Sequence, residues 1–165
     1  MVQEYVYKTG LGQDSHQFLT DSSSKPCIIG GRRFEDVPGL SADSDGDPIF
    51  HSFCNAITSV THVPILGGLA RELYLKGITD SKIYLKEALK FLHPKEIVHI
   101  AFSLEAQKPR LESSLPSIRK NVANIAKIPE DLVGITVTSG DYLTAFGSGL
   151  GIQCFCLLTI REKNR

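Results

Sequence analysis

The apolar residues of this chain follow strand spacing in some segments and helix spacing in others. Residues 5–11 (YVYKTGL) alternate loosely and predict a strand. Residues 27–34 (CIIGGRRF) contain a Gly-Gly pair between two short runs, which predicts a β-hairpin. Three later segments rich in β-branched and aromatic residues predict strands, at 96–106, 134–139 and 151–160.

Three other segments carry apolar residues at helical spacing. The first helix is expected to begin after Asp47, because a carboxylate suits the N-cap and Pro48 suits the first helical position. Its apolar positions are Ile49, Phe50, Phe53, Cys54, Ile57 and Val60. Asp80 is expected to cap a second helix, and residues 113–128 predict a third. Pro64 and the glycines after it predict a loop with short helical turns between the first two helices.

The predicted order is strand, hairpin, two helices, strand, helix and two strands. This order indicates an α/β fold of the α+β sandwich type, with one mixed sheet and helices packed on one face. The length suits one domain over residues 1–165, and the chain contains no repeat or linker.

Composition narrows the class of protein further. Hydrophobic residues make up 42% and charged residues 22%, which argues against disorder. Lys+Arg and Asp+Glu both number 18, and this zero net charge argues against broad nucleic-acid binding. No apolar run reaches the roughly 20 residues of a membrane helix, and the first residues lack a signal-peptide pattern. A cytoplasmic protein with no membrane or nucleic-acid partner is therefore expected.

Four cysteines are present, and their spacing does not match a zinc ribbon. Cys154 and Cys156 are two residues apart in an apolar run, so they are expected on one face of a strand. Buried free thiols are the expected state, with metal binding as the alternative.

The stretch ADSDGDPIFH, residues 42–51, places three aspartates within five positions. A calcium loop that starts at Asp43 needs a bidentate glutamate at its twelfth position, which is Cys54 here. Pro48 also lies inside this hypothetical loop. The stretch is therefore expected to form a turn at Gly46 and a helix cap at Asp47.

A second group of polar residues suits a metal. Asp14 and His16 are two apart, so on extended backbone they project from the same face. His51 lies one turn into the first predicted helix. One carboxylate and two imidazoles form a three-ligand set for zinc that leaves a fourth position open. The alternative is structural, with a strand-end aspartate, a solvated His16 and a His51 bonded to a nearby carbonyl.

The ordered motifs resemble the 2-C-methyl-D-erythritol 2,4-cyclodiphosphate synthase family of the non-mevalonate isoprenoid pathway. These motifs are G-x-D-x-H-x-F (12–18), P-x-I-I-G-G (26–31), S-D-G-D (44–47) with His51, Q-x-P-R-L (107–111), T-S-G-D-x-L (138–143) and a glycine-rich segment (146–151). They cover nearly the whole chain in order. The resemblance implies a phosphorus–oxygen lyase that cyclises 4-diphosphocytidyl-2-C-methyl-D-erythritol 2-phosphate and releases CMP. It also implies a homotrimer with active sites between subunits.

The resemblance assigns roles to particular positions. It implies one zinc per active site, held by Asp14, His16 and His51, and a Mg²⁺ or Mn²⁺ ion on the substrate diphosphate, reached by Asp141. It further implies that Asp43 and Ser139 serve at the reacting phosphates as catalytic residues. The substrate-binding set it implies is Asp14, His16, Asp43, Ser44, Ile65, Leu66, Gly67, Pro109, Arg110, Leu111, Thr138, Ser139 and Asp141.

The sequence also departs from the family pattern. Asp43 stands where relatives have a histidine, and Ile65 where they have an aspartate that bonds the erythritol hydroxyls. Asp141 replaces a glutamate, and Ser148 and Leu150 replace an arginine and a glutamate near the trimer axis.

These departures leave a second hypothesis open, a non-catalytic relative that binds zinc and a cytidine nucleotide. A third hypothesis, suggested by the apolar strands and neutral charge, is a structural assembly without ligand.

Overall fold

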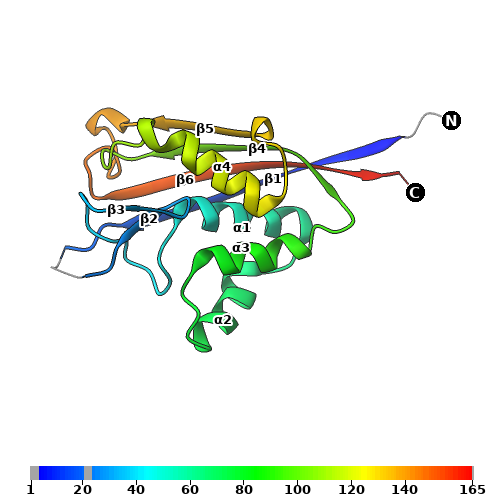
Figure 1. The fold of residues 1–165 in the computed structure, drawn as a ribbon, viewed down its shortest axis with the longest axis horizontal. Coiled ribbons are helices and arrows are strands. Elements are labelled where there is room, and N and C mark those ends of the chain that lie inside the picture. Colours follow the sequence, from blue (N-terminus) through cyan, green and yellow to red (C-terminus); the bar gives the residue numbers. More distant parts are fainter. Residues whose placement is uncertain (1–3, 21–23, 165) are drawn as a thin grey trace.

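The computed structural model describes residues 4–20 and 24–164. Four strands form one mixed sheet in the order β1-β6-β4-β5 (Figure 1). β6 pairs antiparallel with both β1 and β4, and β4 pairs parallel with β5, so β1 and β5 are the edge strands. The bounds are β1 Tyr5–Gln17, β4 Glu96–Glu105, β5 Val133–Thr138 and β6 Gly151–Lys163.

The predicted hairpin is confirmed, but it forms a separate two-stranded sheet. It consists of β2 (Cys27–Ile29) and β3 (Arg32–Phe34), which pair antiparallel. Gly30 and Gly31 make its turn with φ of +60° and +75°, a region that only glycine adopts without strain.

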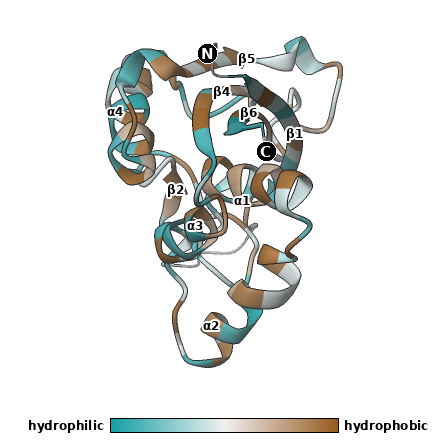
Figure 2. Cartoon of the chain, turned by 90° about the vertical axis from the view of Figure 1, so that its right-hand side faces the viewer, coloured by the Kyte–Doolittle hydropathy of each residue, from teal (hydrophilic) through white to brown (hydrophobic). Residues whose placement is uncertain are grey.

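The helices cover one face of the main sheet, as the sequence predicts. α1 packs against β1 and β6, α4 against β5, and α3 against α1. Figure 2 shows the strands as one layer with α1, α3 and then α2 beneath it. The helices are α1 Pro48–Thr61, α2 Arg71–Leu75, α3 Ser81–Lys90 and α4 Leu115–Ala126, with a π-helix η1 at Ile65–Ala70 and 3₁₀ turns η2 Glu112–Ser114, η3 Glu130–Leu132 and η4 Gly140–Tyr142.

The start of α1 is fixed by Asp47, as predicted. Its Oδ1 accepts hydrogen bonds from Ile49 N at 3.0 Å and Phe50 N at 3.2 Å. The same carboxylate accepts from Gly30 N at 2.9 Å and Gly31 N at 2.6 Å. One buried side chain therefore caps the helix and attaches the hairpin turn to it. All six apolar positions predicted for this helix are buried.

Small residues allow α1 to lie close to β1. A Cβ atom added to Gly12 would lie 2.0 Å from the carbonyl oxygen of Ser52 and 2.3 Å from the amide nitrogen of Ala56. A Cβ atom added to Gly10 would likewise lie 2.5 Å from the carbonyl oxygen of Ala56. Backbone atoms cannot give way cheaply, so these two glycines set the distance between the first strand and the first helix.

The opposite face of the sheet lacks a covering layer within residues 4–20 and 24–164. Leu11, Phe155 and Leu157 are 59%, 40% and 45% exposed there. Leu157 pairs with Leu11 on one side and with Ala101 on the other, so the apolar side chains form a row across three strands. We call Leu11, Ala101, Phe155 and Leu157 the outer apolar row.

The cysteines are buried and free, as expected from the sequence. Burial raises the pKa of the Cys27 thiol to about 12, and it also raises the pKa values of the other three thiols well above their usual range. Cys154 and Cys156 share the inner face of β6. None of the four is therefore a nucleophile at neutral pH.

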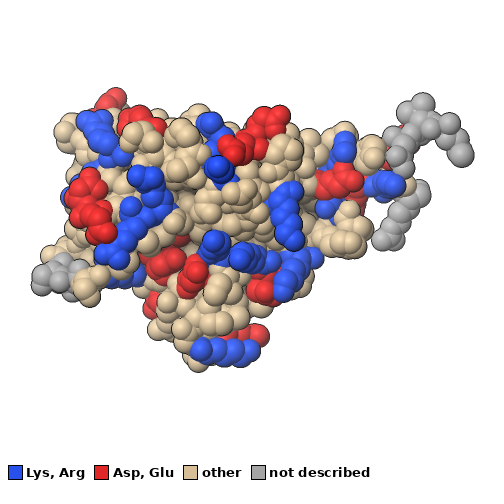
Figure 3. All heavy atoms as spheres, viewed as in Figure 1, with Lys and Arg blue, Asp and Glu red and all other residues tan. Residues whose placement is uncertain are grey.

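Basic and acidic side chains are interspersed on the face shown in Figure 3. Within the described part of the chain, none of the helices combines the length and apolarity required to cross a bilayer.

Candidate metal centre

The first strand continues six residues beyond its predicted end and carries Asp14 and His16 on its helix-facing side. His51 lies in the first turn of α1, directly opposite. The Asp14 Oδ2 atom lies 2.9 Å from His16 Nε2 and 3.4 Å from His51 Nδ1. The two imidazole nitrogens are 3.2 Å apart. The three ligand atoms therefore form a nearly equilateral triangle.

This triangle fits a tetrahedral metal ion. Ligands at zinc distances and tetrahedral angles are about 3.3 Å apart, close to the observed separations. Asp14 Oδ2 is buried and receives no hydrogen bond of good geometry, so a polar atom is left for an ion to satisfy. Among the described residues, these three form the only group of three or more His, Cys, Asp or Glu side chains arranged so that they could hold a metal.

Hydrogen bonds on the far side of each ring fix which nitrogen faces the centre. His16 Nδ1 donates to the carbonyl oxygen of Ser41 at 3.0 Å, which leaves Nε2 as an acceptor. His51 Nε2 lies 2.8 Å from Ser81 Oγ. The single hydroxyl proton of Ser81 goes to the carboxylate of Asp45, so the imidazole must donate and its Nδ1 is free for a metal.

The charges at the centre are coupled. Burial alone would raise the pKa of the Asp14 carboxyl, but the two adjacent imidazoles outweigh it and the pKa is lowered. Burial alone would lower the pKa of His16, but Asp14 outweighs it and the pKa is raised. Asp14 is thus held as a carboxylate, the form in which it binds a cation.

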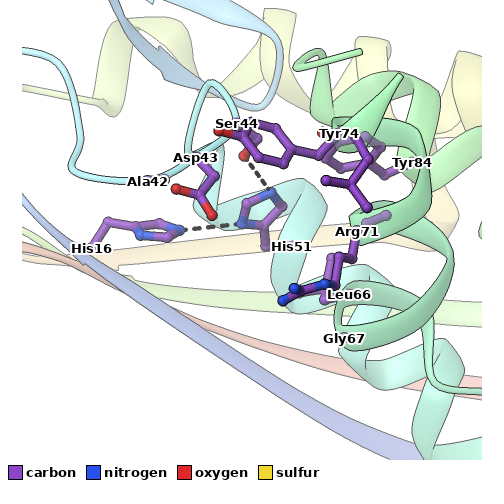
Figure 4. A pocket seen from close by; sticks show the side chains of 12 residues that line it. His16, Ala42, Asp43, Ser44, His51, Leu66, Gly67, Arg71, Tyr74 and Tyr84 are labelled. Atoms are coloured by element: carbon purple, nitrogen blue, oxygen red, sulfur yellow. Dashed lines mark hydrogen bonds between the residues drawn. The ribbon is translucent and has the colours of Figure 1, made fainter. Parts of the chain in front are cut away.

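A cavity of about 430 Å³ opens beside the centre. Figure 4 shows His16 and His51 facing each other on its floor, with Asp43 and Ser44 above them. Leu66 and Gly67 line the opposite wall, but the side chain of Ile65 is fully buried and lies outside the lining. We call this space the triad cavity. Of the three predicted binding residues in that loop, two face it.

The remaining predicted site residues form a second group at the other edge of the sheet. A smaller cavity of about 40 Å³, at the carboxyl ends of β4 and β5, brings together Pro109, Arg110, Leu111, Thr138 and Ser139. We call these five residues the β5-edge group. It lies at the same end of the sheet as the metal centre, but β6 and β4 separate the two.

Asp141, the predicted magnesium contact, follows the β5-edge group in a tight turn. It adopts a left-handed conformation with φ of 45° and accepts a hydrogen bond from Ser139 Oγ at 2.8 Å. Gly140 before it is left-handed as well, with φ of 71°. Tyr142 after Asp141 is the third successive left-handed residue, and the bond from Ser139 holds the Asp141 carboxylate close to the end of β5.

Sequence analysis did not single out several residues around the triad cavity, among them Arg71, Ser81 and Tyr84. Tyr84 stacks on the His51 ring, with centroids 6.4 Å apart and planes at 18°. Ser81 follows a helix cap and resembles any first-turn serine. Arg71 belongs to a short helix that has no apolar periodicity, so no pattern in the sequence marks these positions as part of a site.

The fold and the centre together define a class, an α/β protein whose edge strand β1 and helix α1 bring together an Asp-His-His group that can hold a metal. The chain belongs to the YgbB family, whose family model matches residues 7–161. It is 55% identical over 98% of its length to 2-C-methyl-D-erythritol 2,4-cyclodiphosphate synthase of Chlamydia trachomatis serovar A, covering 92% of that protein. It is 51% identical to the synthase of Chlamydia felis, over 96% of this chain and 92% of that one.

Several solved structures are similar to this chain. The bifunctional IspDF of Campylobacter jejuni superposes with a TM-score of 0.85 at 25% identity, over 96% of this chain and 43% of that one. The CDP complex of IspF from Plasmodium falciparum superposes with a TM-score of 0.83 at 24% identity, over 96% and 97% of the two chains. The latter likeness concerns the fold alone.

Proposed function

We propose that this chain is a 2-C-methyl-D-erythritol 2,4-cyclodiphosphate synthase. In this reaction an oxygen of the substrate's 2-phosphate forms a bond to the β-phosphorus of its diphosphate. The bond from that phosphorus to the bridging oxygen breaks, and CMP leaves with that oxygen. The product is 2-C-methyl-D-erythritol 2,4-cyclodiphosphate.

One observation carries the proposal, the convergence of Asp14, His16 and His51 on a point at the floor of an open cavity. Relatives at 50% to 55% identity that bear this enzyme's name support it. The absence of a reactive thiol is also consistent with it, because the attacking group is a phosphate of the substrate.

We propose that the three ligands hold one zinc ion per site, and that Asp141 assists a Mg²⁺ or Mn²⁺ ion on the diphosphate. Such ions supply positive charge that polarises phosphoryl oxygens. Asp14 contributes the anionic ligand. Ser41 and Ser81 hold the two imidazoles in the orientation that directs one nitrogen of each to the centre.

The walls of the two cavities suggest how the substrate lies. In the triad cavity, Ser44 and the backbone of Leu66 and Gly67 are assigned to the erythritol phosphate, and Asp43, which lines the same cavity, is assigned to the reacting groups. Ile65 is fully buried, so in this proposal it contributes through its backbone alone.

In the β5-edge group, Pro109, Arg110 and Leu111 are assigned to the cytidine end of the substrate. Thr138 and Ser139 are assigned to its phosphates, with Ser139 at the reacting group. Holding both ends in line is the main catalytic task in this intramolecular transfer.

We propose a homotrimer with active sites between subunits. The metal centre and the β5-edge group occupy opposite edges of the sheet. In a head-to-tail ring, the metal centre of one chain would therefore meet the β5-edge group of the next chain. The outer apolar row supplies a surface of the kind that interfaces bury. We further propose a cytoplasmic location and no nucleic-acid or membrane partner, consistent with the zero net charge and the small phosphorylated substrate.

The test is release of CMP from the substrate in the presence of zinc and magnesium, measured by chromatography beside metal analysis of the protein. Wild-type protein is expected to yield CMP and the cyclic product in equal amounts. His16→Ala is expected to lose both zinc and activity, while the exposed His99→Ala keeps them. Product formation that is equal in His16→Ala and wild type would refute the proposal.

A further inference from the structure

The wall of the triad cavity opposite the metal centre is formed by η1 and α2 and carries one cationic side chain. Its lining residues there are Leu66, Gly67, Ala70, Arg71, Tyr74 and Leu75. Among the described residues that line this cavity, Arg71 is the only lysine or arginine. Figure 4 places its guanidinium beside Leu66, across the cavity from His16.

Within the described chain, Arg71 makes no ion pair or hydrogen bond. Asp14 is engaged with the two imidazoles, and Asp45 accepts hydrogen bonds from Ser81. Asp43 lines the same cavity, so one carboxylate and one guanidinium face this space. A guanidinium that has five donors and no protein acceptor is available for an anion, and its planar fork matches phosphate.

We propose that Arg71 binds the phosphate monoester of the substrate and thereby determines which ligands the triad cavity accepts. This inference rests on the proposed function. There the diphosphate goes to the metal ions with Thr138 and Ser139, and the cytidine end goes to Pro109, Arg110 and Leu111. The monoester is then the anionic group left for the triad cavity, where Arg71 offsets its charge and that of Asp43.

The chemistry gives Arg71 a positioning role as well. The monoester oxygen must approach the β-phosphorus in line with the bond that breaks. A bidentate contact fixes both the location and the rotation of a phosphate, whereas a lysine fixes the location alone. Replacement by lysine is therefore expected to keep part of the affinity and less of the turnover rate.

Three variants test the proposal, Arg71→Gln, Arg71→Lys and the control Arg119→Gln, a half-buried arginine of α4 that does not line the triad cavity. KM for the full substrate is expected to rise about 10- to 100-fold in Arg71→Gln, the range of one charge-assisted contact. Arg71→Lys should recover part of this loss, and Arg119→Gln should match wild type. Affinity for CDP, which lacks the monoester, and zinc content should be unchanged in all three.

Direct binding separates this inference from the proposed function. Calorimetry with the zinc-loaded protein measures affinity for the full substrate whether or not CMP is released. If wild type releases no CMP but binds the substrate at least tenfold more tightly than Arg71→Gln, the proposed reaction fails and the Arg71 contact stands. Equal substrate affinity and equal KM in wild type and Arg71→Gln would overturn the inference, as would an equal loss of CDP affinity.

Discussion

At the scale of single residues, the geometry of the candidate metal centre depends on groups outside the three proposed ligands. His51 is held on both sides of its ring, by Ser81 at Nε2 and by the stacked Tyr84. Ser81 is in turn held by Asp45, whose backbone N–H also donates to the oxygen of Thr79 at 2.9 Å. The acidic loop around Asp45 therefore acts on the centre through a serine on another helix.

Removing that serine hydroxyl should weaken metal binding. We expect Ser81→Ala to lower zinc affinity about 10- to 100-fold, the usual effect of losing an outer-shell partner of a ligating histidine. Competition with a chromogenic chelator measures the affinity directly.

The matched control is Ser117→Ala, which removes a hydroxyl of α4 that donates to the carbonyl oxygen of Ser114 and does not line the triad cavity. Zinc affinity unchanged in Ser81→Ala, or equally lowered in Ser117→Ala, would contradict this role. Restoration of affinity by Ser81→Thr would support it.

At the scale of elements, Asp47 joins α1 to the hairpin. Its carboxylate accepts four backbone N–H groups, two from the start of the helix and two from the β2–β3 turn. Because the carboxylate is fully buried, no water replaces it when it is removed. Helix α1, which carries His51, and the β2–β3 hairpin therefore both depend on Asp47.

We expect Asp47→Ala to lower the free energy of unfolding by about 3 kcal/mol, since a lost cap costs about 1 kcal/mol and unsatisfied buried N–H groups cost more. Urea denaturation followed by circular dichroism measures the change.

Asp80→Ala is the control at the start of α3. Its carboxylate accepts one hydrogen bond, from Lys82 N at 2.8 Å, and is exposed. A loss of about 1 kcal/mol or less is expected there. If the two variants lose equal stability, the additional role of Asp47 at the hairpin is wrong.

The elements also differ in how well the sequence predicts them. α1 was predictable because a cap, a proline and six apolar positions agree. The end of β1 was not, because its inward residues after Leu11 are Gly12, Asp14 and His16, which break the apolar alternation while still facing the helix. Likewise, the candidate ligands could be predicted from their spacing in the sequence. The residues of η1 and α2 that line the triad cavity could not, because Pro64 and the glycines after it obscure the helical periodicity.

At the scale of the whole molecule, the sheet separates the candidate metal centre from the β5-edge group, which we propose to be two halves of one site. β1 and α1 carry the candidate metal ligands, and the carboxyl ends of β4 and β5 carry the β5-edge group. In the homotrimer proposed above, each half would meet its complement on a neighbouring chain.

Mixing two inactive variants tests this arrangement. His16→Ala and Arg110→Ala are each expected to be inactive. Co-refolded at equal amounts, they should regain up to about a quarter of wild-type activity, since a random ring combines an intact half from each partner that often. CMP release and sedimentation of the mixture measure this.

If both halves serve a site within one chain, the mixture stays inactive. A second variant, Leu157→Glu in the outer apolar row, should shift the protein toward single chains. It should retain zinc but lose turnover, whereas the exposed Leu75→Glu on α2 should remain assembled.

The burial of the four cysteines has a practical consequence. A thiol that is protonated and enclosed reacts with a disulfide reagent only when the chain around it opens. In native protein, labelling is expected to be slow and to accelerate with urea. Cys54, Cys154 and Cys156 lie between α1 and the sheet, directly behind the metal ligands. Their labelling rates, measured with and without zinc, would report how much zinc binding slows local unfolding of the core.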